Sequence, residues 1–377
     1  MAAIVGGVSK VMKLMVIAGA RPNFMKIAPL LKAVQANGVS PGGSKLRYRL
    51  VHTGQHYDAK MSDLFFSELG IPAPDFNLEV GSDSHAKQTS LIMAKFEPVC
   101  ESEKPDWVIV VGDVNSTLAC TLVCAKLQIR VAHVEAGLRS FDRTMPEEIN
   151  RIVTDALASL LLTPSQDANQ NLQREGIDQG KIKLVGNIMI DSLVQNLDKA
   201  RRGRTLENYG VQERQFVYVT LHRPSNVDHQ ESLSQIMAEL KRLAKRMTVI
   251  FPMHPRTRKM LCNFNISDAG TDRIKLTQPI GYHDSLCLTE QARFVLTDSG
   301  GLQEESTFFR TPCLTLRPNT ERPITLSMGS NRLTSLERLR SDIDEVLAGP
   351  DRIGSVPPLW DGQTARRCVD CIQAALN

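Results

Sequence analysis

The 377-residue chain lacks an apolar run long enough to cross a membrane, and it lacks a large net charge. A membrane-spanning helix needs about 20 apolar residues, and Lys10 and Lys13 interrupt the apolar N-terminal stretch. The formal charge is only +4, from 45 basic and 41 acidic residues spread along the chain. We therefore expect a cytoplasmic protein that binds neither membranes nor nucleic acid. Residues 1–12 are expected to be a short extension, with Met12 as an alternative start.

Common nucleotide-binding and metal-binding motifs are also missing from the sequence. It contains no GxxxxGK[S/T] loop and no GxGxxG fingerprint, which argues against a P-loop NTPase and against ordinary NAD chemistry. Eight cysteines are present, but no two pairs of them have the spacing of zinc ligands. Buried, reduced thiols in a cytosolic protein are the better interpretation.

Short apolar or β-branched runs alternate with helical patterns, which is typical of parallel α/β sheets. In the first half, strands are expected at residues 14–18, 48–52, 107–111, 130–133, 160–162 and 183–185. The helices between them are expected at residues 23–36, 58–69, 85–100, 116–127, 146–156 and 165–175. A second set of strands is expected at residues 216–221, 248–253, 274–276, 294–297 and 313–316.

The chain is longer than one hydrophobic core usually organises, and the alternation restarts near residues 188–210. We expect a Rossmann-like domain at residues 1–195 and a second at 196–360. A terminal helix at 361–377 is expected to pack near the domain junction. The fold class is thus α/β, with two parallel-sheet domains facing a cleft where ligands usually bind.

The densest cluster of charged residues, HVEAGLRSFDRTMPEEINR (133–151), follows a short apolar run. Acids and bases packed this closely after a buried strand indicate a site that moves protons near a bound anion. The candidates are Glu135, Glu147 and Arg151, with Asp113 after the preceding strand. Each has a structural alternative, because Asp113 can cap the following helix and Glu135 can pair with Arg139 or Arg151.

Three strand-to-helix turns have the residues of a phosphate site. LTDSGGLQEE (296–305) offers close backbone approach at its two glycines, amides at a helix start, and acids that can reach a ribose diol. A tight turn before an acid-rich helix is the alternative. GARPNFMKIAPL (19–30) offers an Arg fork and a Lys charge, and TLHRPSN (220–226) offers a His. The candidates are Arg21, Lys26, His222, Ser299, Gly300, Gly301 and Glu305.

These segments form a recognisable set together with HTGQHYD (52–58), VGDVNSTLA (111–119), VGNIMID (185–191), PMHPRT (252–257) and NTERP (319–323). The set resembles the non-hydrolysing UDP-N-acetylglucosamine 2-epimerase family, in order and over nearly the whole chain. The resemblance implies a fold like the GT-B nucleotide-sugar glycosyltransferases, with the active site in the interdomain cleft. It also implies a homodimer and a reaction without metal or redox cofactor.

The implied reaction inverts C2 of UDP-GlcNAc to give UDP-ManNAc. UDP is eliminated to leave a 2-acetamidoglucal, then added again with protonation from the opposite face, which requires an acid, a base and a stabilised diphosphate. By motif match, Asp113 and Glu135 transfer protons at C2, Glu147 assists, and Arg151 and His222 stabilise the leaving group. The match assigns UDP binding to Arg21, Lys26, His254, Ser299, Gly300, Gly301 and Glu305.

Two departures from the family pattern leave alternatives open. Pro224 and Ser225 precede Asn226 where many members have an acid, and Ile324 follows NTERP where an acid is common. Asp58, in HTGQHYD, stands where an amide is frequent, so activation by a second UDP-GlcNAc is not assumed. The rivals are a 2-epimerase for a modified sugar such as a UDP-diacetamido-uronic acid, a hydrolysing relative, a GT-B glycosyltransferase and a binding protein without catalysis.

Overall fold

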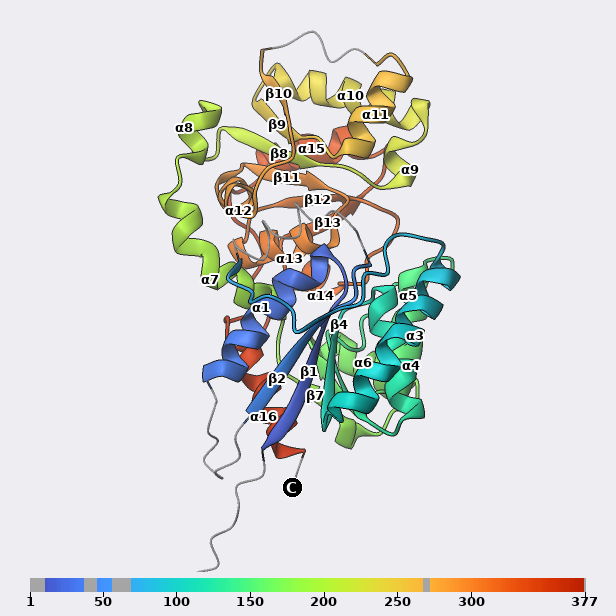
Figure 1. Cartoon of the computed structure of the whole chain (residues 1–377). Coiled ribbons are helices and arrows are strands. Elements are labelled where there is room, and N and C mark those ends of the chain that lie inside the picture. The colour runs from blue at the N-terminus through green and yellow to red at the C-terminus, as the bar shows by residue number, and fades with distance from the viewer. Residues whose placement is uncertain (1–10, 37–45, 56–68, 267–271, 376–377) are drawn as a thin grey trace, which may run out of the picture. The chain divides into compact units, whose positions relative to one another are not determined.

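The computed structural model describes residues 11–36, 46–55, 69–266 and 272–375, and only the backbone at Arg21 and Pro22. The chain divides into two compact units, Met1–Ser192 with Asp361–Asn377 (unit 1) and Leu193–Trp360 (unit 2). Each unit is built on a parallel sheet with helices between the strands (Figure 1), which confirms the expected fold class. The helix expected at 58–69 falls almost wholly outside the described residues.

Unit 1 has a seven-stranded parallel sheet in the order β3-β2-β1-β4-β5-β6-β7. The direction in which strands are added reverses between β1 and β4, so the loops that follow these two strands diverge to opposite faces. Such a switch point at the carboxyl edge is where ligands of open α/β sheets bind. The strands are β1 Met12–Ala18, β2 Leu46–His52, β3 Phe76–Asn77, β4 Trp107–Val111, β5 Arg130–Val134, β6 Leu160–Thr163 and β7 Ile182–Leu184.

The helices of unit 1 cover the sheet, and the last one comes from the end of the chain. They are α1 Arg21–Ala36, α3 His85–Glu103, α4 Asn115–Lys126, α5 Pro146–Leu157, α6 Gln166–Arg174 and α16 Thr364–Ala374, with η1 Gln179–Lys181 and the start of α7 Ile188–Arg202. Helix α16 packs on α1. Its first amides donate to the buried Asp191 carboxylate, from Thr364 N at 3.0 Å and Ala365 N at 2.7 Å. Asp191 therefore holds this helix on unit 1 by capping it.

Unit 2 has a six-stranded parallel sheet in the order β10-β9-β8-β11-β12-β13, with its switch point between β8 and β11. The strands are β8 Phe216–Thr220, β9 Thr248–Pro252, β10 Ile274–Thr277, β11 Phe294–Thr297, β12 Cys313–Leu316 and β13 Asn331–Thr334. The helices are α8 Thr205–Tyr209, α9 Pro224–Val227, α10 Gln230–Ala244, α11 Pro255–Asn263, α12 Tyr282–Gln291, α13 Gly300–Phe309, α14 Ile324–Ser327 and α15 Leu339–Ala348.

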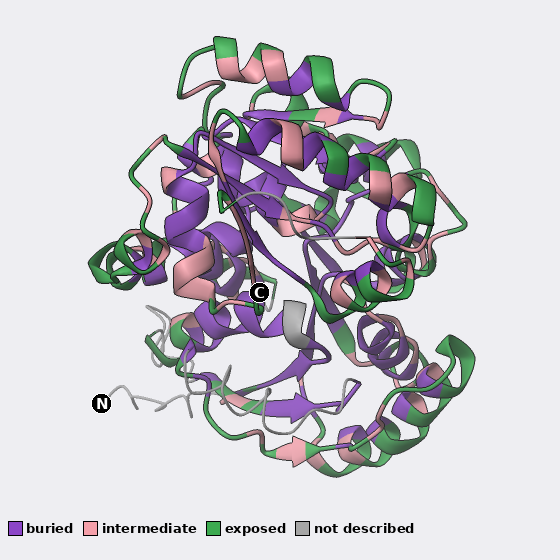
Figure 2. Ribbon diagram, turned by 90° about the horizontal axis from the view of Figure 1, so that it is seen from above, coloured by how far each residue is buried: buried purple, intermediate pink, exposed green. Residues whose placement is uncertain are grey.

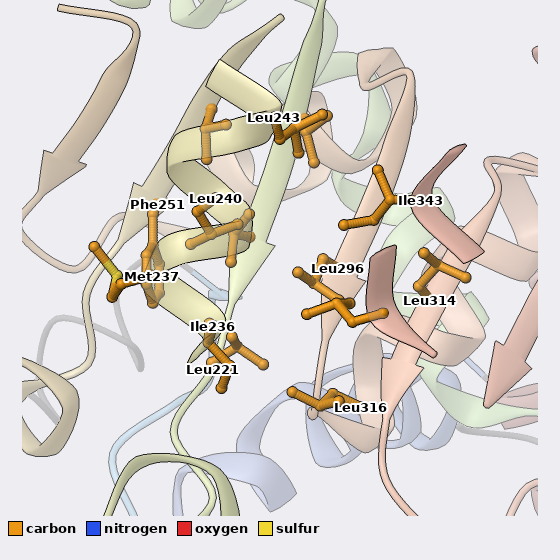
Figure 3. Close-up of a cluster of buried hydrophobic side chains, with 14 of the residues drawn as sticks. Leu221, Ile236, Met237, Leu240, Leu243, Phe251, Leu296, Leu314, Leu316 and Ile343 are labelled. Atoms are coloured by element: carbon orange, nitrogen blue, oxygen red, sulfur yellow. The ribbon is translucent and has the colours of Figure 1, made fainter. Parts of the chain in front are cut away.

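The central strands of both sheets are almost wholly buried, as Figure 2 shows by colour. In unit 2, Leu240 of α10 packs with Phe251 of β9, and Leu296 of β11 lies near Ile343 of α15 (Figure 3). Strands covered on both faces read as continuous apolar runs, which is why most were predictable from the sequence. None of the described helices is long and apolar enough to cross a membrane.

Two strands were not predicted. Strand β3 has only two residues, and β13, NRLT, has a single apolar residue. Both lie at a sheet edge. Edge strands pair on one side only and are less buried, so their sequences do not carry the apolar signal of the central strands.

Candidate active site

The turn after β1 is held to the turn after β4 by a buried asparagine. Asn23 Oδ1 accepts from the Ala20 amide at 3.0 Å, and Asn23 Nδ2 donates to the Val111 carbonyl at 2.8 Å. A Cβ on Gly19 would lie 2.8 Å from Ser116 Oγ, so only glycine fits at this close approach. Arg21 is the first residue of α1, and its side chain lies outside the described part of the structure.

Lys26 and Glu135 form a buried ion pair beside this junction. The Lys26 ammonium donates to Glu135 Oε2, and both side chains are less than one-tenth exposed. Glu135 has a left-handed backbone, with φ 69°. A Cβ added to Gly112, whose φ is 68°, would come 3.0 Å from Lys26 Nζ and 3.3 Å from Glu135 Oε2. The ion pair therefore packs directly on the residue that precedes Asp113.

A network of charged side chains, Asp113, Arg151 and Glu148, runs from the surface of unit 1 into its interior. Arg151, 2% exposed, donates to Asp113 Oδ2 and to Glu148 Oε2, the latter from Nη2 at 2.6 Å and Nε at 2.9 Å. Glu148 also accepts the amides of Ser140 at 3.0 Å and Phe141 at 2.9 Å. Burial raises the pKa of Glu148, but these amides and Arg151 outweigh burial and leave it below its ordinary value. Asp113 is the more exposed end, at 31%.

Glu147 and Glu148 are neighbours with opposite environments. Glu148 is buried and pairs with Arg151, whereas Glu147 is exposed in the first turn of α5. Sequence reasoning named Glu147 and missed Glu148. The spacing of Glu148 and Arg151, three residues apart on a helix, was the available signal for their pairing.

Two structural alternatives for the carboxylates are wrong. Helix α4 begins after Val114 and has no side-chain cap, so Asp113 does not cap it. Glu135 pairs with Lys26, while Arg139 pairs with the buried Asp155 and with Glu175. Asp113 and Glu135 thus pair with different cations, Arg151 and Lys26.

In unit 2, the turn after β8 is built on the buried Asp298, which follows β11 across the switch point. Its carboxylate accepts the amides of His222 at 3.0 Å and Arg223 at 2.8 Å, and the Asn226 side chain at 2.9 Å. His222 Nδ1 lies 3.0 Å from Asp298 Oδ1, and 41% of the His222 side chain is exposed. Burial raises the pKa of Asp298, but His222 and the other donors leave it below the usual range. Asp298 therefore orients the His222 ring.

His254 lies beside His222, with ring centroids 5.5 Å apart. It is the N-cap of α11, and its Nδ1 accepts the Arg256 amide at 3.2 Å. An Nδ1 that accepts leaves the proton of the neutral ring on Nε2. Nδ1 is thus the engaged nitrogen in both rings, facing the Asp298 carboxylate in His222 and accepting a backbone amide in His254.

The start of α13 combines the first amides of a helix with a buried arginine. Ser299 is the N-cap, and Gly300 and Gly301 are the first helical residues. A Cβ on Gly300 would lie 2.7 Å from Arg322 Nη1, so the absence of a side chain at this residue allows the Arg322 guanidinium to pack against it. Arg322 contacts Glu304 Oε1 at 2.9 Å and also pairs with Glu321. A helix N-terminus next to a guanidinium favours a bound anion. Arg322 belongs to the NTERP segment but was not among the predicted site residues.

Glu305 lies within the second turn of α13 and is buried. Burial, with a smaller contribution from Glu304, raises the pKa of Glu305 to about 8, although a hydrogen bond with Tyr282 opposes the shift. A protonated carboxyl can donate a hydrogen bond as well as accept one. Across the described residues, no group of three or more His, Cys, Asp or Glu side chains has the geometry of a metal site.

Comparison with known proteins identifies the family. A family model described as UDP-N-acetylglucosamine 2-epimerase matches residues 42–373. The chain belongs to this family. Its membership confirms the resemblance seen in the motifs and makes the protein an isomerase, an epimerase of nucleotide sugars.

Individual relatives are similar over most of their length. The UDP-N-acetylglucosamine 2-epimerase of Methanocaldococcus jannaschii is 44% identical over 329 residues, covering 85% of this chain and 88% of that protein. The UDP-2,3-diacetamido-2,3-dideoxy-D-glucuronate 2-epimerase of Pseudomonas aeruginosa is 39% identical over 330 residues, covering 87% and 89%. A crystal structure of the M. jannaschii epimerase in complex with UDP-GlcNAc and UDP matches with a TM-score of 0.85 and 41% identity, covering 96% and 100%.

Proposed function

We propose that this epimerase interconverts UDP-GlcNAc and UDP-ManNAc without hydrolysis. In the first step, a base takes the C2 proton and the bond from C1 to the diphosphate oxygen breaks, giving UDP and a 2-acetamidoglucal. In the second step, UDP adds to C1 and an acid protonates C2 from the opposite face. The products balance the substrates, so no water or oxidant is consumed.

We assign the proton transfers to the carboxylates of unit 1. Asp113 and Glu135 are the acid and base at C2. Glu147, an exposed residue in the first turn of α5, assists. Arg151, fixed by Glu148, is proposed to stabilise the departing diphosphate through the charge that it also shares with Asp113. Preorganised cations of this kind act on charge that develops in the transition state.

The UDP group is assigned to residues of unit 2 together with two residues of α1. The Ser299 hydroxyl and the amides at Gly300 and Gly301 are proposed to bind the diphosphate, and Glu305 to bind the ribose. His222, oriented by Asp298, is proposed to assist departure of UDP. The remaining candidates for UDP binding are Arg21, Lys26 and His254.

The observation that carries the proposal is the separate pairing of two carboxylates at neighbouring strand ends. Glu135 is paired with Lys26 after β5, and Asp113 with Arg151 after β4. An inverting C2 reaction needs two groups that exchange protons on opposite faces, each in its own environment. Two such groups next to one switch point meet this requirement.

A modified UDP-sugar is the second candidate substrate. The P. aeruginosa relative, a UDP-2,3-diacetamido-2,3-dideoxy-D-glucuronate 2-epimerase by name, is 39% identical to this chain. In addition, Pro224 and Ser225 replace an acid that is common after the His-Arg pair. Without a negatively charged side chain near the sugar, a sugar that carries its own carboxylate would bind with less electrostatic repulsion.

The decisive experiment follows the C2 proton. The protein is incubated with UDP-GlcNAc in deuterated water, and the products are followed by NMR. Deuterium at C2 with a mixture of UDP-GlcNAc and UDP-ManNAc is expected. Free ManNAc would indicate hydrolysis instead, and if no exchange occurs the same test with the diacetamido-uronic acid decides the substrate.

Glu135→Gln provides the matching variant test. It is expected to abolish exchange at C2, a loss of at least about 100-fold for a missing acid or base, while UDP still binds. Glu97→Gln, an exposed acid on α3 of the same unit, is the control and should keep wild-type activity. Exchange that survives in Glu135→Gln would contradict the assignment.

Two further properties complete the proposal. The resemblance to the family suggests a homodimer, which sedimentation equilibrium tests by mass. The near-balanced charge and the described helices, none of which could span a membrane, are compatible with a cytoplasmic location, which cell fractionation tests.

A further inference from the structure

A fully buried histidine joins the two turns that carry Asp113 and Glu135. His133 is the fourth residue of β5 and is 0% exposed. Its Nε2 lies 2.9 Å from the carbonyl oxygen of Gly112, on the turn after β4. Its Nδ1 lies 2.6 Å from Asp155 Oδ1, on helix α5. Both ring nitrogens are therefore engaged, and the side chain does not reach a substrate.

The partners of the ring determine where its protons are. A carbonyl oxygen only accepts, so Nε2 must carry a proton. Asp155 also accepts from Arg139 Nη1 at 2.7 Å and from the Gly137 amide at 3.0 Å, both through Oδ2. Burial raises the pKa of Asp155, but His133 and Arg139 outweigh burial and leave it below its ordinary value. Nδ1 faces this carboxylate, so the ring bridges Asp155 and the Gly112 carbonyl.

The other end of this network fixes the turn that follows Glu135. Asp155 holds the Gly137 amide and the Arg139 side chain, and Asn171 Nδ2 donates to the Gly137 carbonyl at 3.0 Å. Glu135 itself has φ 69°, a conformation that a non-glycine residue keeps only where its surroundings impose it. The network provides such surroundings.

We propose that His133 is a positioning residue for the reaction, whose buried ring ties the Gly112–Asp113 turn to the Glu135–Gly137 turn through Asp155 and so fixes the separation of the acid and the base. The inference rests on the proposed function, since it concerns the same two carboxylates. It assigns His133 and Asp155 a role in catalysis without contact with the substrate.

Three substitutions separate the two bonds of the ring. His133→Asn keeps a donor near Nδ1 and loses the bond to Gly112, whereas His133→Gln keeps a donor near Nε2 and loses the bond to Asp155. His133→Phe loses both. We expect kcat to fall about 100-fold in His133→Phe, since a displacement of ~1 Å at a reacting group has this effect, and by less in the two amide variants. KM and the Kd for UDP should stay within about threefold, because ground-state binding is not changed.

Val131→Ala is the matched control, since Val131 is buried on the same strand but makes no contact with the ring nitrogens. It should lower Tm with kcat within twofold of wild type when all proteins are assayed well below their Tm. A kcat of His133→Phe within threefold of wild type, or an equal loss in Val131→Ala at equal Tm, overturns the proposal. If His133→Phe does not fold, the two amide variants decide by the same criteria.

Nitrogen NMR of the histidine ring gives a readout that does not depend on the substrate. The ring of His133 should carry a proton on Nε2, the nitrogen that faces the Gly112 carbonyl oxygen. An Nε2 without a proton overturns the inference even if the enzyme is active. Absence of C2 exchange in the wild-type protein with either UDP-sugar overturns the proposed function instead, so the two failures are distinguishable.

Discussion

Arg151→Met tests the charged network of Asp113, Arg151 and Glu148 by its effect on the free energy of unfolding. Methionine keeps much of the arginine volume but removes the charge, leaving Glu148, 1% exposed, with backbone amides as its remaining donors. Removing one partner of a buried ion pair costs about 3–5 kcal/mol, because the other charge stays buried and uncompensated. The expected loss in the free energy of unfolding is therefore about 3–5 kcal/mol at neutral pH.

Urea and thermal unfolding at several pH values measure this loss. For domains of ~150–250 residues, each kcal/mol shifts Tm by about 2–4 °C, so a fall in Tm of roughly 6–20 °C is expected. The pKa of Glu148 is below its ordinary value of 4.5 in the folded protein. The stabilisation that Arg151 provides is then fully present above that ordinary value and is lost as pH falls through the folded pKa. The difference between wild type and variant should thus be larger at pH 7 than at pH 4.

Arg366→Met is the control for this prediction. Arg366 is 72% exposed and lies 3.9 Å from Asp370 one helical turn away, an arrangement that contributes little to stability. Its loss should change the free energy of unfolding by less than about 0.5 kcal/mol. The reasoning is refuted if Arg151→Met destabilises no more than Arg366→Met, or if its effect does not change with pH.

Three other changes have defined outcomes. Gly112→Ala should cost about 1–2 kcal/mol for the left-handed backbone and reduce kcat, because the new Cβ presses on Lys26; an unchanged kcat in steady-state assays would contradict this. Asp191→Ala should cost about 1–3 kcal/mol for the unsatisfied α16 amides and expose the C-terminal helix to limited proteolysis. Glu305 has a raised pKa of about 8, so its contribution to the free energy of unfolding is lost as pH rises from 4.5 toward 8. In Glu305→Gln, the free energy of unfolding should depend less on pH across that window. An unchanged pH dependence would show that another group causes it.

The edge of the sheet on which the site residues lie was predictable from the sequence. Within two residues of a strand end lie Asp113 and Glu135 in unit 1 and His222 and Ser299 in unit 2, and parallel strands bring the carboxyl ends of each sheet to one edge. The strands themselves were visible because burial on both faces selects continuous apolar runs. The edge strand β13 was missed because its sequence, NRLT, is mostly polar.

Pairing between charged residues was not predictable in the same way. Lys26 and Glu135 are 109 residues apart, and nothing in the local sequence of either names the other. Arg139, an expected partner of Glu135, instead bonds Asp155 and Glu175. Several cations near several acids permit many pairings, and the three-dimensional path of the chain selects one of them.

The sequence by itself determined the family, the parallel α/β class and the set of acids and bases available for catalysis, because these follow from motifs and from the periodicity of apolar residues. Only the tertiary structure decided that Glu148 turns inward while Glu147 stays exposed, and that His133 joins the turns of Asp113 and Glu135. The physical reason is that burial and hydrogen bonding depend on groups distant in the chain, which local sequence does not specify.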